Sequence, residues 1–510
     1  MRTAEPGTTP AGRTARPGPA GVPATRGASG GPAEAPEGRT PPAGSPAAGH
    51  PAATSAPAAA GSGGPSAPAG PSAADGPAGP AGPPAGPASP ARPASPAAGP
   101  AAPIDPARWP DVAAVPRSSW ARTAVTGALV RRALRGLPLR ARFAGAEPVG
   151  RGGPLLEVRD PAAFHARVGT SGLVGFGESY MAGEWDAPDL VAALTVLAAH
   201  TADLVPAPLQ RLRGLWAPRH PHEERNTPDG SRSNISRHYD LSNDLFALFL
   251  DDTLSYSSAV FRGFPATWDL LAAAQRRKVD RLLDLAGVRE GTRLLEIGTG
   301  WGELALRAAA RGARVTSITL SREQRERALE RVRAAGAGDR VSIELCDYRE
   351  ARGTYDAVVS VEMIEAVGAE FWPAYFRTLD ERLDPGGRVA LQAITMPHER
   401  MLATRDTFTW IHKYVFPGGV IPSTEAIEDT ARAHTRLRPA RRDAFGAHYA
   451  ETLRLWRERF TARAGELGAL GFDETFRRLW TFYLAYCEAG FRAGYLDVQQ
   501  YLFTKERPAR

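Results

Sequence analysis

The chain has 510 residues, with 62 Lys and Arg against 55 Asp and Glu, a formal net charge of +7 and 43% hydrophobic residues. This length allows two or three domains with a sizeable core, and the basic balance suits an anionic membrane surface or nucleic acid. We expect no nucleic-acid partner, because there is no zinc-finger spacing and no aromatic RNA-binding motif. Two cysteines, Cys346 and Cys487, do not suggest a disulfide framework. Lys occurs only at Lys278, Lys413 and Lys505, which we attribute to GC-rich coding.

Residues 1–103 have the composition of a disordered tail. They are almost wholly Ala, Pro, Gly, Ser and Thr, with scattered Arg and no aromatic residue. Such a segment has too little apolar bulk to offset the ordering entropy of its backbone. A dispensable extension is the simplest interpretation, and a tether is the alternative.

The chain shows no targeting or membrane-spanning segment. No apolar stretch follows the first basic residues, and no run is long enough to cross a bilayer. We therefore expect a cytoplasmic protein that lies at the inner face of the membrane.

Residues 104–205 are typical of a small α+β domain, with a strand at 155–160 and helices at 160–169 and 188–200. Before them, residues 120–142 interleave apolar side chains with Arg. This pattern predicts either a basic amphipathic helix on anionic lipid or an ordinary surface helix with its apolar side on the core. The Pro- and Arg-rich residues 206–233 indicate a linker to a third segment, 234–510.

From residue 292 onwards strands and helices alternate, as in a parallel sheet covered by helices. The predicted strands are 292–297, 313–319, 340–346, 355–362 and 388–394. We expect the chain after them to be mainly helical and to close over the carboxyl edge of the sheet. The fold class is thus a doubly wound, Rossmann-like α/β sheet with a helical lid, preceded by the small α+β domain and the tail.

A glycine-rich loop follows the first of these strands. The string Glu296-Ile297-Gly298-Thr299-Gly300-Trp301-Gly302 has G-x-G-x-G spacing, and the next strand ends Thr319-Leu320-Ser321 without an acidic residue. Glycines let the backbone turn sharply and approach a ligand at the carboxyl ends of the strands. The spacing of the glycines and the lack of an acidic residue at the end of the next strand favour S-adenosylmethionine (SAM) over a dinucleotide as the ligand. Ser321 and Gln324 also form a capping-box pattern that would hold the next helix.

Several longer strings resemble those of the cyclopropane-fatty-acid synthase family. They include HYDLSNDLFALFLDDTLSYSSAVF, LLEIGTGWG, TLSREQ, DYRE, SVEMIEAVG, HYAETLRLW and FYLAYCEAGFR, in family order over residues 234–510. GFGESYMAGEWDAPDL additionally resembles the family's N-terminal lipid-associated domain. The resemblance implies a SAM-dependent methyltransferase that alkylates the cis double bond of a phospholipid acyl chain at the bilayer surface.

The resemblance also implies the residues of the cofactor site. Carried over by motif, they are Tyr256, Ser257, Glu296, Gly298, Gly300, Gly302, Thr319, Leu320, Ser321, Gln324, Tyr348 and Arg349. No metal site is implied.

The family's active site also holds a bicarbonate ion, and the resemblance places its catalytic shell at five positions. They are Glu365, Tyr449, Ser258, Gln392 and Ile394. Two of these depart from the family pattern, because Ser258 stands for the usual Cys and Gln392 for the usual His. Neither Cys346 nor Cys487 replaces that cysteine.

The chemistry needs a base, because methyl addition to an alkene leaves a carbocation that must lose a proton. Aromatic faces and the Glu365 carboxylate can stabilise the cation. Gln392 cannot take a proton, so removal of the proton from the carbocation falls to bicarbonate or to Glu365. We read the altered shell as a shift from a cyclopropane toward a methyl- or methylene-branched product. A methylene product would need a separate reductase to become saturated.

Other interpretations stay open at this stage. A relative of the same fold could methylate a small-molecule amine, and the altered shell also fits a non-catalytic lipid-binding protein. His238-Tyr239-Asp240 is expected to order a loop over the cofactor, and His412 to be structural. Tyr449 fits catalysis or simple packing equally well. A homodimer also stays open.

Overall fold

The computed structural model describes residues 103–201, 226–227, 230–231, 234 and 242–506. The predicted tail up to residue 102, most of the predicted linker, and His238-Tyr239-Asp240 lie outside the described residues. The predicted domain boundary near residue 205 falls there too and stays a prediction.

The segment from 103 to 201 combines five helices with a three-stranded sheet of order β1-β2-β3. Its elements are α1 (Pro110–Ala113), α2 (Trp120–Arg135), β1 (Arg140–Phe143), β2 (Leu155–Val158), α3 (Pro161–Ser171), α4 (Leu173–Met181), β3 (Trp185–Asp186) and α5 (Leu190–Ala199). The Asp160 carboxylate accepts hydrogen bonds from two backbone N–H groups of the first turn of α3, which begins there with a proline. The Asp189 carboxylate caps α5 by accepting a hydrogen bond from the Ala192 backbone N–H. The strand and both helices predicted in this segment are confirmed.

The main sheet has seven strands in the order β6-β5-β4-β7-β8-β10-β9. They are β4 (Arg293–Ile297), β5 (Arg314–Thr319), β6 (Val341–Leu345), β7 (Tyr355–Val361), β8 (Leu383–Thr395), β9 (Leu437–Ala444) and β10 (Asp497–Lys505). The five predicted strands form its parallel part, from β6 to β8. This confirms the predicted fold class.

The chain after the fifth predicted strand was expected to be mainly helical, but it contains two further strands, β9 and β10. β10 pairs antiparallel with β8 on one side and with β9 on the other. β9 carries a proline and several charged side chains, as an edge strand tolerates, and lacks a clear alternation of apolar residues. β10 is buried on both faces and carries Gln499 and Gln500 among its buried residues, which masks its apolar pattern.

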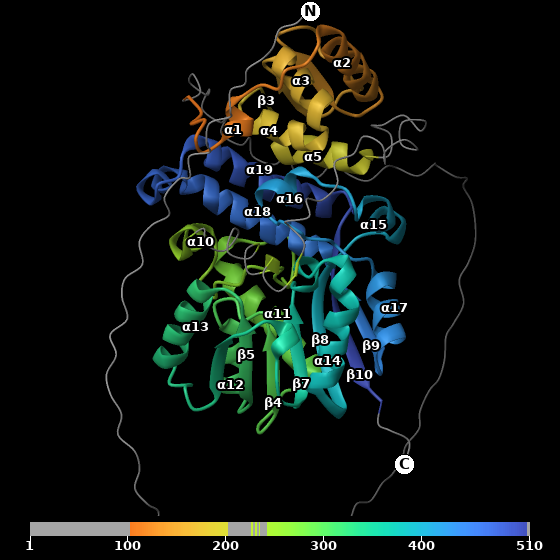
Figure 1. Ribbon diagram of the computed structural model, residues 1–510. Helices are drawn as coiled ribbons and strands as arrows, with labels where there is room; N and C mark the ends of the chain where they lie inside the picture. Colours follow the sequence, from red (N-terminus) through yellow and green to blue (C-terminus); the bar gives the residue numbers. More distant parts are fainter. Residues whose placement is uncertain (1–102, 202–225, 228–229, 232–233, 235–241, 507–510) are drawn as a thin grey trace, which may run out of the picture. The chain divides into compact units, whose positions relative to one another are not determined.

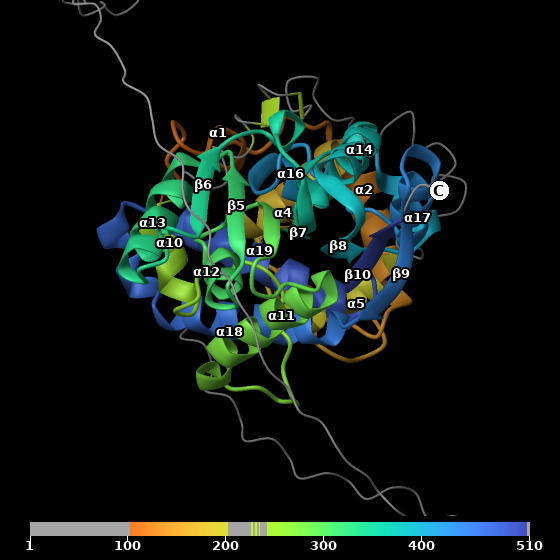
Figure 2. The same cartoon turned by 90° about the horizontal axis from the view of Figure 1, so that it is seen from below.

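Helices cover both faces of the sheet (Figure 2). On one face lie α11 (Leu271–Ala286), α12 (Glu303–Ala310) and α13 (Arg322–Ala334), whose apolar side chains share a core with β4, β5 and β6. On the other lie α14 (Trp372–Arg382) and α17 (Thr424–His434), which pack on β7, β8 and β10. The carboxyl ends of the parallel strands are thereby left as the place for a ligand.

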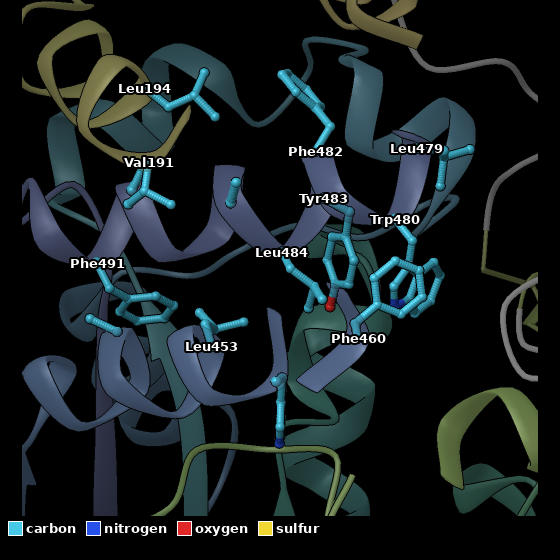
Figure 3. Close-up of a cluster of buried hydrophobic side chains, with 14 of the residues drawn as sticks. Val191, Leu194, Leu453, Phe460, Leu479, Trp480, Phe482, Tyr483, Leu484 and Phe491 are labelled. Atoms are coloured by element: carbon cyan, nitrogen blue, oxygen red, sulfur yellow. The ribbon is translucent and has the colours of Figure 1, made fainter. Parts of the chain in front are cut away.

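The predicted helical lid lies over these carboxyl ends (Figure 1). It consists of α15 (His398–Thr404), α16 (Trp410–Tyr414), α18 (Gly446–Ala462) and α19 (Glu474–Arg492), and α10 (Asn243–Phe249), which precedes the sheet in sequence, packs on α18. Figure 3 shows buried apolar side chains of α18 and α19 packed together, with Val191 and Leu194 of α5 on the far side of α19. None of the described helices has the length and apolarity needed to cross a membrane.

Short 3₁₀ helices complete the described elements. They are η2 (Trp268–Leu270), η3 (Tyr348–Glu350), η4 (Ile364–Ala366), η5 (Ala369–Phe371), η6 (Ala464–Glu466) and η7 (Gly468–Leu470). Because η3 and η4 follow strands β6 and β7, they bring their residues to the carboxyl edge of the sheet.

Candidate active site

A pocket opens where β4, β5 and β7 end, next to the glycine-rich loop. Gly298 and Gly300 have φ of 98° and 53°, a left-handed conformation that side-chain-bearing residues rarely adopt. A Cβ atom at Gly298 would lie 3.3 Å from Cγ of Met363. The loop therefore needs glycine both for its turn and for its close approach to the opposite wall.

Most of the predicted cofactor residues line this pocket. They are Tyr256, Ser257, Glu296, Gly298, Gly300, Thr319, Leu320, Gln324 and Tyr348.

The other three predicted cofactor residues hold the surrounding structure. Gly302 precedes the first turn of α12, and the Ser321 hydroxyl accepts a hydrogen bond from the Gln324 N–H at the start of α13. Arg349 forms an ion pair of 2.7 Å with Asp347 and donates to the Asn226 carbonyl oxygen.

Two buried ionisable side chains lie in the pocket wall. The Glu296 carboxylate accepts a hydrogen bond of 2.5 Å from the Ser317 hydroxyl, and burial raises its pKa to about 8. Lys278 of α11 donates to the Ser257 hydroxyl at 2.6 Å, and burial lowers the pKa of its ammonium to about 8.

Sequence reasoning missed Lys278, although a signal was present. In a chain that uses Arg almost throughout, all three lysines make interior contacts. Lys413 forms ion pairs with Glu178 and Asp111, and Lys505 donates to the carbonyl oxygens of Asp380 and Leu383. The attribution of these lysines to coding alone therefore overlooked a structural use of a compact ammonium group.

Three of the five predicted catalytic residues converge on a carboxylate that sequence reasoning also missed. Glu362 directly follows β7, and it is partly buried. Its Oε1 accepts hydrogen bonds from the Ser258 backbone N–H at 3.0 Å and from Nε2 of Gln392 at 2.7 Å. Its Oε2 accepts a hydrogen bond of 2.7 Å from the Tyr449 hydroxyl. The signal was a second Glu in the string SVEMIEAVG, three residues before Glu365 and closer to the strand end.

The remaining two predicted residues form a neighbouring contact. Glu365, in η4, accepts a short hydrogen bond from the Ile394 backbone N–H. Its Oε2 has no hydrogen-bond partner among the described residues. Burial, together with the nearby Glu362 carboxylate, raises the pKa of Glu365 to about 8. Burial raises the pKa of Glu362 as well, against the opposing effect of Lys278.

Tyr449 joins this carboxylate pair to a group of packed aromatic side chains. Tyr449 packs on Phe491 with ring centroids 4.6 Å apart, and Tyr256 packs on Trp456 at 5.4 Å. The Tyr256 and Tyr483 hydroxyls are 2.6 Å apart and share a hydrogen bond. A cation that forms here would meet aromatic faces and carboxylates.

His412 is placed as expected for a structural residue. Its Nδ1 accepts a hydrogen bond of 3.0 Å from the Thr409 backbone N–H, within the first turn of α16. Among the described residues, no group of three or more His, Cys, Asp or Glu side chains could hold a metal ion.

In a comparison with known protein families, residues 226–501 match the mycolic acid cyclopropane synthetase family. The tuberculostearic acid methyltransferase UfaA1 of Mycobacterium tuberculosis is 55% identical over 414 residues, which cover 79% of this chain and 97% of the relative. The cyclopropane-fatty-acyl-phospholipid synthase of Escherichia coli is 34% identical over 354 residues, covering 69% of this chain and 87% of the relative.

Solved structures agree with these relatives. The cyclopropane synthase MmaA2 from Mycobacterium tuberculosis superposes with a TM-score of 0.50 at 30% identity, covering 56% of this chain and 99% of that one. The mycolic acid cyclopropane synthase CmaA1, complexed with SAH and CTAB, has a TM-score of 0.50 at 31% identity with the same coverage.

Proposed function

This chain belongs to the mycolic acid cyclopropane synthetase family, and from that premise we propose that it methylates the cis double bond of an unsaturated phospholipid acyl chain, giving a methyl- or methylene-branched product. It is a SAM-dependent methyltransferase. One observation carries the proposal. The wall of the cofactor pocket continues through Glu362 into a partly buried cluster of carboxylates and aromatic rings.

The residues of the pocket fit SAM. The glycine loop allows close approach of a ligand, and Thr319 and Gln324 supply polar atoms at the ends of β5 and α13. When bound, SAM supplies an electrophilic methyl group. The chain's own residues then hold the acyl chain against it, exclude water under the α18–α19 lid, and take up a proton.

The branched product is supported by two observations. The 55% identical relative bears the name of a methyltransferase, whereas the 34% identical one bears that of a cyclopropane synthase. The cluster also contains Gln392, whose amide donates to a carboxylate and cannot itself take a proton. A methylene product would pass to a separate reductase.

A lipid surface is the proposed partner of helix α2. Gly127 and Leu134 are buried on its inner side, whereas Trp120 is 83% and Val125 60% exposed, with Arg132 and Arg135 exposed at its end. Apolar side chains and arginines exposed together suit anionic headgroups. In Trp120→Ser we expect about two- to threefold weaker sedimentation with vesicles containing anionic phospholipid, with unchanged turnover of detergent-dispersed substrate. Equal sedimentation of both proteins would remove α2 from the proposal.

The decisive experiment incubates purified protein with methyl-labelled SAM and oleoyl phospholipid vesicles, followed by mass spectrometry of the released fatty acids. We expect a gain of one labelled CH₂ unit, and fragmentation that locates a branch. A fragmentation pattern showing only a ring would overturn the branched product. Unlabelled lipid despite SAM binding would favour methyl transfer to a small-molecule amine, and absent SAM binding a non-catalytic lipid-binding protein.

A further inference from the structure

The bicarbonate that the family resemblance implies does not fit the donors of this site, because they already serve a carboxylate of the chain. Ser258 N–H, Gln392 Nε2 and the Tyr449 hydroxyl all donate to Glu362. A second anion beside Glu362 would find these donors taken, and two adjacent negative charges disfavour each other.

The contacts also explain how the two departures from the family pattern are tolerated. Ser258 reaches the carboxylate through its backbone N–H, while its hydroxyl donates to the Ala259 carbonyl oxygen at 3.1 Å. The side chain at this position therefore need not hold the anion. The Gln392 amide oxygen accepts a hydrogen bond of 2.9 Å from Nε2 of Gln500 on β10. This contact orients the Gln392 amide so that its Nε2 points toward Glu362.

The backbone holds the Glu362 carboxylate in this position. Glu362 has φ of 48°, and such left-handed conformations of residues other than glycine concentrate at functional sites. Its N–H donates to the Gln392 carbonyl oxygen at 2.7 Å, which ties the turn to the neighbouring strand. The side chain also lines the cofactor pocket beside Met363. A carboxylate so placed lies between the methyl donor's site and the aromatic lid.

We propose that Glu362 is the catalytic base of the methyl transfer and that its carboxylate takes the place of bicarbonate. This inference rests on the proposed function. As one alkene carbon bonds to the methyl group, the sulfur–methyl bond breaks and positive charge is left on the acyl chain. A C–H bond there then yields its electron pair to a new C=C bond, and the proton passes to Glu362. The resulting carboxylic acid returns the proton to solvent before the next turnover.

The neighbouring groups assign this step to Glu362. Gln392 has no titratable proton, and the Tyr449 hydroxyl donates its own proton to the carboxylate. Glu365 accepts from the Ile394 N–H and does not share the three donors.

The test compares wild type, Glu362→Gln, Glu362→Gly and the matched surface control Glu330→Gln in CO₂-free buffer and with added bicarbonate. Glu330 lies on α13 in an exposed pair with Arg327. Wild type and the control should turn over equally in both buffers. Glu362→Gln should lose about 10²- to 10⁴-fold in kcat in either buffer, since its amide fills the site without accepting a proton. Glu362→Gly should lose activity in CO₂-free buffer and regain part of it with bicarbonate, because the donors become free.

A second readout does not depend on turnover. Bicarbonate labelled with ¹³C should show line broadening with Glu362→Gly and none with wild type, and SAM titration should show both variants folded. Wild type that needs bicarbonate, or that binds it in the NMR experiment, would overturn the inference, as would a Glu362→Gln variant with normal turnover. Wild type that is inactive on lipid in every buffer would instead overturn the proposed function. The NMR comparison would still show whether Glu362 or bicarbonate accepts the hydrogen bonds from the three donors.

Discussion

The cofactor pocket and the Glu362 cluster lie side by side but are built in different ways. The pocket comes largely from short segments that follow consecutive strands, such as the loop around Gly298 and the turn after Thr319. The cluster joins the Ser258 backbone N–H to side chains from the turn after β7 and from β8, α18 and β10, and Ser258 and Glu362 are 104 residues apart in sequence. The pocket is thus a product of local backbone geometry, and the cluster a product of long-range packing. Changes in the first should act on SAM binding, and changes in the second on turnover.

Among the changes that compare these two regions, Glu362→Asp should give the largest effect. Shortening the side chain by one methylene keeps the charge and withdraws the carboxylate from the Ser258 N–H and the Tyr449 hydroxyl. A misplacement of about 1 Å costs about 10²-fold in rate, which should appear in kcat. The SAM dissociation constant, measured by calorimetry, should stay within about twofold. A matching loss of SAM affinity would mean that the two regions are not separable.

Gly298→Val should reverse that pattern. A β-branched residue at φ of 98° is strained, and its side chain would meet Met363. We expect about 10- to 100-fold weaker SAM binding from about 1–3 kcal/mol of strain, with kcat at saturating SAM changed far less. Gly338→Val is the control, since Gly338 is exposed and nothing lies within 4 Å of its added Cβ. Equal losses in both variants would point to general destabilisation.

Gln500→Leu tests a member of the cluster that does not contact Glu362 itself but positions Gln392. Without the donor that orients it, the Gln392 amide is free to turn away from Glu362. We expect about tenfold lower kcat.

Loss of a hydrogen bond to the charged form should also raise the pKa of Glu362, whose other charged neighbours are Lys278 and Glu365. Because the base must be deprotonated, activity is lost as the pH falls through this pKa, and the rise in rate should move to higher pH than in wild type. A purely structural role of Gln500 would lower stability without moving the pH profile.

Of these variants, Glu365→Gln should have the smallest effect, and the effect should appear in the stability of the folded protein. The pKa of Glu365 is raised from an ordinary 4.5 to about 8, first by burial and then by Glu362. A group whose folded-state pKa is raised favours folding below its unfolded pKa and loses that contribution as the pH rises through the folded value. The variant should therefore melt higher than wild type by about 2 °C or more at pH 9, with the gap closing toward pH 4, in calorimetric scans. A constant gap across this range would contradict the assigned pKa.

Sequence reasoning recovered the parts of this protein that local patterns encode. The alternation of apolar strands and helices predicted the parallel half of the sheet, and Ser321, in the predicted capping pattern, accepts a hydrogen bond from the Gln324 N–H at the start of α13. The glycine spacing located the pocket, because a tight turn at a strand end needs particular residues at particular positions. Strands β9 and β10 were not predicted, since their burial and pairing depend on strands far away in sequence.

The identity of the central carboxylate was decided only by the tertiary structure. The string SVEMIEAVG contains two glutamates, and a pattern alone cannot tell which one meets Ser258, Gln392 and Tyr449. That depends on the turn after β7, on the lid helix α18, and on Gln500 reaching across from β10. Hydrogen bonds between such distant segments form only when the chain has packed, because packing brings each donor to its acceptor and removes competing water from most of the cluster.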